Sequence, residues 1–110
     1  MASGSGNRVQ YGVFVGPLRC QDVHPNELAR RVYRLMMGIG LSVEHIDKIS
    51  LNTDKGYARV GLFEIDCENY VVERCGEFKY LTGICDLYQL TTKPQYFRVI
   101  RLQPYTDEFM

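Results

Sequence analysis

Two short segments of this chain alternate in side-chain character, and they constrain its fold more than any other feature. Residues 57–63 read Y-A-R-V-G-L-F, with an aliphatic side chain at every second position. Residues 11–15 read Y-G-V-F-V, which sets Val13 and Val15 on one side and Phe14 on the other. Because successive side chains of a strand point to opposite faces, both segments are predicted to be strands of a sheet with one buried face.

A helix is predicted between these strands. Pro25 suits the first helical position and Glu27 the third. Gly38 and Gly40 are expected to end the helix. Its apolar residues recur at intervals of three and four, as one buried stripe requires: Leu28, Val32, Leu35 and Met36.

The opposite side of this helix carries Glu27, Arg30, Arg31 and Arg34 at spacings that allow ion pairs. Such a cluster is most often the solvated side of a helix. A role in contacting phosphate or an acidic partner is the alternative.

Further elements follow along the chain. A strand is predicted from His45 to Leu51, followed by a turn at residues 52–56. A second helix is expected to be capped by Asp66, to run to about Arg74 and to close at Gly76. Its buried stripe would comprise Cys67, Tyr70, Val71 and Cys75.

The C-terminal part contains two strand-like runs, Ile84–Thr91 and Tyr96–Leu102, separated by residues 92–95. They are predicted to form a hairpin. Either run could be the fourth strand of the core sheet, with the other as an added edge strand or as part of the hairpin that precedes it; Tyr96–Leu102 is favoured as the core strand.

The resulting order is strand, helix, strand, strand, helix, strand. It predicts an α+β fold of the ferredoxin-like βαββαβ class, a sandwich in which two helices cover one face of a four-stranded antiparallel sheet, with a possible extra C-terminal strand. One domain is expected over residues 9–104. Residues 1–8 are interpreted as a flexible leader or an artificial extension and residues 105–110 as a C-terminal tail.

Two motifs on the alternating strands make a family resemblance specific. The hexamer Val13–Leu18 (V-F-V-G-P-L) and the octamer Lys55–Leu62 (K-G-Y-A-R-V-G-L) resemble the paired motifs of the RNA-recognition-motif (RRM) family. The resemblance implies a module of a ribonucleoprotein factor that binds single-stranded RNA on its open sheet face. It further implies that Phe14 and Tyr57 stack on bases and that Lys55 contacts phosphate.

The octamer also departs from the family pattern. Arg59 stands where a third aromatic platform is expected, although a guanidinium group can also stack on a base. Leu62 replaces a final aromatic residue. The chain has 13 basic and 13 acidic residues, whereas nucleic-acid-binding domains usually carry a positive excess.

A second hypothesis therefore stands beside RNA binding. In it, the RRM fold serves protein–protein interaction or dimerisation within an RNA-processing complex, with little or no direct RNA contact. A related alternative is that the aromatic C-terminal segment covers the open sheet face. The aromatic residues concerned are Tyr96, Phe97, Tyr105 and Phe109.

Residue types for catalysis or metal binding are sparse. Four cysteines (Cys20, Cys67, Cys75 and Cys85) form no C-x-x-C pair, and the chain has two histidines, so buried free thiols are expected instead of a metal site. The loop Gly16–Cys20 holds one arginine but lacks the glycine-rich stretch of a phosphate-binding loop. We expect no enzymatic activity and no cofactor.

The sequence contains no apolar run near the roughly 18 residues that a membrane-spanning helix needs. We therefore expect no membrane partner and an intracellular protein, cytoplasmic or nuclear.

Overall fold

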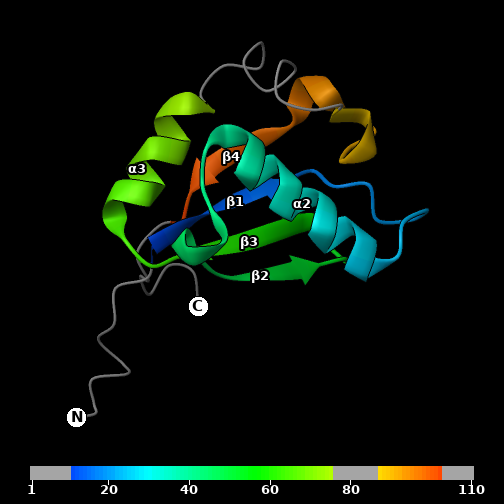
Figure 1. Cartoon of the computed structure of the whole chain (residues 1–110). Coiled ribbons are helices and arrows are strands. Elements are labelled where there is room, and N and C mark those ends of the chain that lie inside the picture. Colours follow the sequence, from blue (N-terminus) through cyan, green and yellow to red (C-terminus); the bar gives the residue numbers. More distant parts are fainter. Residues whose placement is uncertain (1–10, 76–86, 103–110) are drawn as a thin grey trace, which may run out of the picture.

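The computed structural model describes residues 11–75 and 87–102. In chain order the strands and α-helices are β1 (Tyr11–Gly16), α2 (Pro25–Ile39), β2 (Ile46–Asn52), β3 (Tyr57–Leu62), α3 (Ile65–Arg74) and β4 (Arg98–Arg101). Single turns of 3-10 helix lie at Val43–His45, Leu87–Gln89 and Pro94–Tyr96. Figure 1 shows these elements along the chain.

The strands form one sheet in the order β2-β3-β1-β4. β1 pairs antiparallel with β3 and β4, and β3 pairs antiparallel with β2. Within the described residues the fold is therefore α+β, with a four-stranded antiparallel sheet and two α-helices, and it is compatible with a ferredoxin-like fold. The Tyr96–Leu102 run supplies the fourth strand, as favoured.

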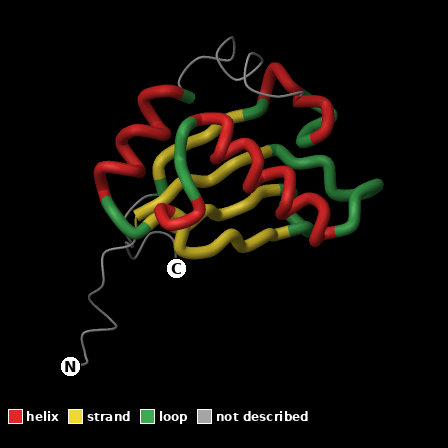
Figure 2. Tube along the Cα trace, viewed as in Figure 1, coloured by secondary structure: helices red, strands yellow, loops and turns green. Residues whose placement is uncertain are grey.

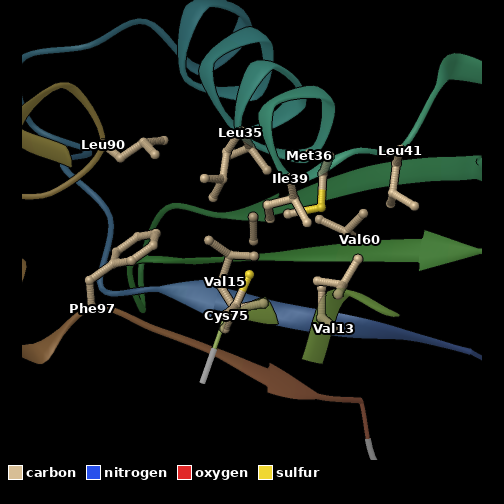
Figure 3. Close-up of a cluster of buried hydrophobic side chains, with 14 of the residues drawn as sticks. Val13, Val15, Leu35, Met36, Ile39, Leu41, Val60, Cys75, Leu90 and Phe97 are labelled. Atoms are coloured by element: carbon tan, nitrogen blue, oxygen red, sulfur yellow. The ribbon is translucent and has the colours of Figure 1, made fainter. Parts of the chain in front are cut away.

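One face of the sheet carries the hydrophobic core. Val13, Val15, Ala58 and Val60 are fully buried there. Leu35, Met36 and Ile39 of α2 point toward these strands (Figure 3), and Val71 of α3 belongs to the same cluster. Both helices therefore cover the same face, as the layered view in Figure 2 shows.

Helix α2 begins as predicted. Pro25 occupies the first turn, and the Nδ1 atom of His24 accepts a hydrogen bond of 3.0 Å from the backbone N–H of Asn26. The predicted apolar stripe is buried. The predicted end needs one correction, because Gly38 lies inside the helix and Gly40 follows its last residue, Ile39.

The starts of β2 and α3 differ from the prediction. β2 begins at Ile46, because His45 ends a 3-10 turn in which its Nδ1 accepts a 3.0 Å hydrogen bond from the N–H of Ser42. α3 begins at Ile65, with Glu64 at the N-cap, so Asp66 lies in the first turn and is not the cap. The predicted end at Gly76 lies outside the described residues.

The predicted C-terminal hairpin is wrong in its described part. Residues 87–89 and 94–96 form 3-10 turns, and residues 84–86 lie outside the description. Leu87 and Leu90 are both buried, and a three-residue spacing places two side chains on one side of a turn of helix. Phe97 is buried in the core, so it does not cover the opposite sheet face. Tyr105 and Phe109 lie outside the described residues.

A buried carboxylate connects α3 to the sheet. Glu68 is 3% exposed, and its Oε1 accepts a hydrogen bond of 2.8 Å from the N–H of Gly12. Arg101 of β4 donates to Glu68 Oε2 and, at 2.9 Å, to Oδ1 of Asn69. Gly12 has a positive φ of 153°, and a Cβ there would lie 2.2 Å from the carbonyl oxygen of Val60, so only glycine fits this position.

Candidate functional site

The face of the sheet opposite the helices holds the sequence-predicted site. Phe14 lies on the central strand β1, where its register partners are Arg59 of β3 and Ile100 of β4. Tyr57 begins β3 on the same face. None of the α-helices of the described chain lies on this side (Figure 2), and Arg59 and Ile100 are exposed. The sheet thus brings Phe14, Tyr57 and Arg59 onto one accessible surface.

The two aromatic rings form an edge-to-face pair. The centroids of Phe14 and Tyr57 lie 5.3 Å apart, and the ring planes are inclined at 87°. This arrangement is the one that the charge distribution of aromatic rings favours. Both residues are half-buried, so the pair keeps part of its ring surface accessible to a flat ligand.

The turn between β2 and β3 positions Tyr57. Asn52 Oδ1 accepts a 3.0 Å hydrogen bond from the N–H of Lys55, and Asn52 Nδ2 donates to the Tyr57 hydroxyl at 3.4 Å. Gly56 has φ +76°, a conformation that favours glycine, and its N–H donates to the Asn52 carbonyl at 2.8 Å. Lys55 is exposed in this turn, two residues before Tyr57 and beyond the strand itself.

An open pocket of about 380 Å³ lies on the same face. It is lined by Phe14, Val15, Gly16, Tyr57, Arg98 and Ile100. The lining has one cationic side chain, Arg98, and no carboxylate. Arg98 donates from Nη1 to the carbonyl oxygens of Gln95 at 3.0 Å and Phe97 at 2.8 Å, which hold its guanidinium group beside the start of β4.

Arg98 and Ile100 were not among the predicted site residues. The sequence pattern indicated the face on which they lie. Each is adjacent to Val99, which is buried, and adjacent residues of a strand point to opposite faces. The sequence did not indicate which strand pairs with β4. Its place beside β1 brings Ile100 next to Phe14.

The loop after β1 uses its backbone groups internally. The N–H of Leu18 donates to the Gly56 carbonyl at 2.7 Å, and the N–H of Arg19 donates to the Leu90 carbonyl at 2.6 Å. These two N–H groups therefore do not converge on an anion in the way that a phosphate-binding loop requires.

The described cysteines are free thiols. Burial raises the pKa of Cys75 to about 12 and also raises the pKa of Cys20. Burial, followed by the charges of Glu64 and Asp66, raises the pKa of Cys67. Thiols with raised pKa values are poor nucleophiles and poor metal ligands. Cys75 is buried as predicted, whereas Cys20 and Cys67 are half-buried, and Cys85 lies outside the described residues.

Neither a cluster of metal-ligating side chains nor a membrane-spanning helix is present in residues 11–75 and 87–102. No group of three or more histidine, cysteine, aspartate or glutamate side chains lies close enough there to hold a metal ion. No helix in that part of the chain has the length and apolar character needed to cross a membrane.

Comparison of the whole chain with models of known protein families, with curated protein sequences and with solved structures finds no match.

Proposed function

We propose that this chain is an RRM-type module of a ribonucleoprotein factor, with the ferredoxin-like βαββαβ fold, that binds single-stranded RNA through the β1/β3 face of its sheet. The observation that carries the proposal is that the half-buried rings of Phe14 and Tyr57 share that face with exposed Arg59, which lies directly opposite Phe14. The RRM resemblance of the two motifs places its functional positions on the same three residues.

The chemistry of this face suits unpaired bases. Every base has a flat π-face, and its stacking on an aromatic side chain contributes about 1–3 kcal/mol. Phe14 and Tyr57 provide such rings. Arg59 provides a guanidinium plane that can stack on a third base. Lys55 in the β2–β3 turn would meet a phosphate group at one end of the face.

The charge of the module predicts how binding responds to salt. The chain has equal numbers of basic and acidic residues, so few phosphate groups would be neutralised in the complex. Since the salt dependence of binding follows the number of phosphate contacts, we expect a shallow decrease of affinity with salt and a dominant contribution from stacking.

The direct test is an amide chemical-shift titration with a degenerate pool of short single-stranded RNA at low salt. We expect shifts concentrated on β1 and β3. The double variant Phe14→Ala with Tyr57→Ala should abolish them while retaining a folded amide spectrum. Wild-type protein that shows no shift at high RNA excess would rule out the proposal.

The open face also supports a second candidate, a protein-interaction or dimerisation module within an RNA-processing complex with little or no RNA contact. Ile100 is 54% exposed and lines the pocket beside Phe14. An exposed aliphatic side chain next to aromatic rings suits an apolar side chain of a protein partner. A dimeric molar mass in solution, together with protection of Ile100 in the dimer, would favour this candidate.

A further inference from the structure

A second hollow lies away from the open sheet face, between helix α2 and the edge strand β2. It has a volume of about 520 Å³. Ala29, Arg30, Tyr33 and Arg34 of α2 form one wall, and Val43 with residues 46–49 forms the other. β2 lies at one end of the strand order, and α2 packs against it (Figure 1). This α2/β2 groove shares no lining residue with the pocket beside Phe14.

The floor of the α2/β2 groove is apolar. Ile46 is buried, and Tyr33 and Ile49 are half-buried against the core. Val43 stands at the margin with 66% of its surface exposed, the largest exposure among the exposed large apolar side chains of the described residues. A concave apolar surface with an exposed aliphatic residue at its margin is typical of a docking site for an apolar side chain.

The margin of the groove is positively charged although the chain as a whole is neutral. Its charged lining residues are Arg30, Arg34, Lys48 and Asp47, which sum to +2. Arg30 and Arg34 have exposed side chains, at 62% and 64%. The groove therefore combines an apolar floor with an electropositive margin.

Neighbouring charges on α2 do not cancel this excess. The carboxylate of Glu27 accepts hydrogen bonds from Arg30 at 2.9 Å and Arg31 at 3.1 Å, and lies 4.0 Å from Arg34. The pKa of Glu27 lies below its usual value, and the hydrogen bond from Arg31 is the largest cause. The single carboxylate of Glu27 thus lies beside three guanidinium groups. Arg31 also donates a 2.8 Å hydrogen bond to the carbonyl of Gln89.

We propose that the α2/β2 groove docks a short acidic peptide segment of a protein partner, with an apolar side chain between Tyr33 and Val43 and flanking carboxylates on Arg30, Arg34 and Lys48. Carboxylates complement the electropositive margin, and guanidinium groups bind them in a two-point geometry. An aliphatic or aromatic side chain complements the floor, which a phosphate backbone would not. This proposal goes beyond RNA binding and does not depend on it.

The test is a selection of random displayed peptides on the full-length chain, followed by chemical-shift mapping with the most enriched peptide. We expect the enriched peptides to carry net negative charge and at least one large apolar residue. Their shifts should centre on residues 29–34 and 43–49. Reversing two marginal charges, with Arg34→Glu and Lys48→Glu, should weaken binding about tenfold or more.

Two controls separate this groove from the sheet face. Arg98→Glu reverses an exposed arginine of the sheet pocket and should leave peptide affinity unchanged. Val43→Ser should weaken peptide binding by a smaller factor than the charge reversal and leave RNA-induced shifts unchanged.

Four outcomes would overturn the docking proposal. They are the absence of any enriched peptide, enrichment of neutral or basic peptides, affinity that is indifferent to the charge reversal, and shifts on the groove from RNA in place of peptide. The variant Phe14→Ala with Tyr57→Ala should still bind the peptide, so a failure of RNA binding and a failure of peptide docking remain distinguishable.

Discussion

The two faces of the sheet share the same strands but have opposite surroundings. Val13 and Val15 have no exposed surface beneath the helices, whereas Phe14, between them, lies on the accessible face. Substitutions on the buried face should therefore act on the free energy of unfolding, and substitutions on the open face should act on binding. Phe97 lies on the buried side and Phe14 on the open side, so the same substitution, phenylalanine to alanine, can be compared on both.

The largest expected effect is on the buried side. Phe97 is 1% exposed, so Phe97→Ala should lower the free energy of unfolding by about 3–5 kcal/mol through lost burial and a cavity. Phe14→Ala should cost less than about 1.5 kcal/mol, because its ring is half-exposed and mainly loses the contact with Tyr57. Urea unfolding monitored by circular dichroism measures both.

Equal losses for the two phenylalanines would contradict the division between the faces. Should Phe97→Ala fail to fold, Phe97→Leu retains much of the buried apolar area and should give a smaller loss in the same direction.

An intermediate effect is expected at the buried carboxylate. Glu68→Ala would leave the N–H of Gly12 without its acceptor and Arg101 without its ion pair. We expect a loss of about 1–3 kcal/mol in the free energy of unfolding. Glu73→Ala on the exposed side of the same helix is the matched control and should change stability by less than about 0.5 kcal/mol. A loss as large for Glu73 as for Glu68 would contradict a specific contribution of the buried contact, because alanine favours the helix more than glutamate does at both positions.

The smallest effect is expected on the open face. Arg59→Phe would place a third aromatic ring opposite Phe14. We expect RNA affinity to rise severalfold, about 0.5–1 kcal/mol, because a base gains a ring in place of a guanidinium plane. Fluorescence anisotropy with labelled RNA measures the affinity, and unfolding by urea should show little change. A lower affinity would indicate that Arg59 contacts RNA through its charge.

The strands and helices whose apolar residues recur at a regular interval could be predicted from the sequence. The alternation around Val13 and Val60 identified β1 and β3, and the spacing from Leu28 to Met36 identified the buried stripe of α2. The described part of the run 84–91 was misread. Its apolar residues were taken as a strand, although residues 87–89 form a 3-10 turn and buried Leu90, directly after this turn, lies three residues from buried Leu87.

The candidate site could be predicted only in part, because local motifs identify some of its residues and strand pairing brings in the others. Motif spacing located Phe14, Tyr57 and Arg59, whereas Arg98 and Ile100 required knowledge of which strand pairs with β1. Glu68 was missed although it precedes Val71 and Cys75 by three and seven residues, which puts it on the buried stripe. Its partners Gly12 and Arg101 are distant in sequence, and no local pattern connects them.

The contact between Glu68 and Gly12 has a consequence for cooperativity. The Gly12 amide is bonded to a side chain of α3, while its carbonyl accepts a 2.8 Å hydrogen bond from the N–H of Leu102, just after β4. A central strand, a helix and an edge strand therefore meet at one residue. The Gly12 amide can exchange only when its hydrogen bond to Glu68 opens, so the rate of hydrogen exchange at this amide reports how often this contact between helix and sheet breaks.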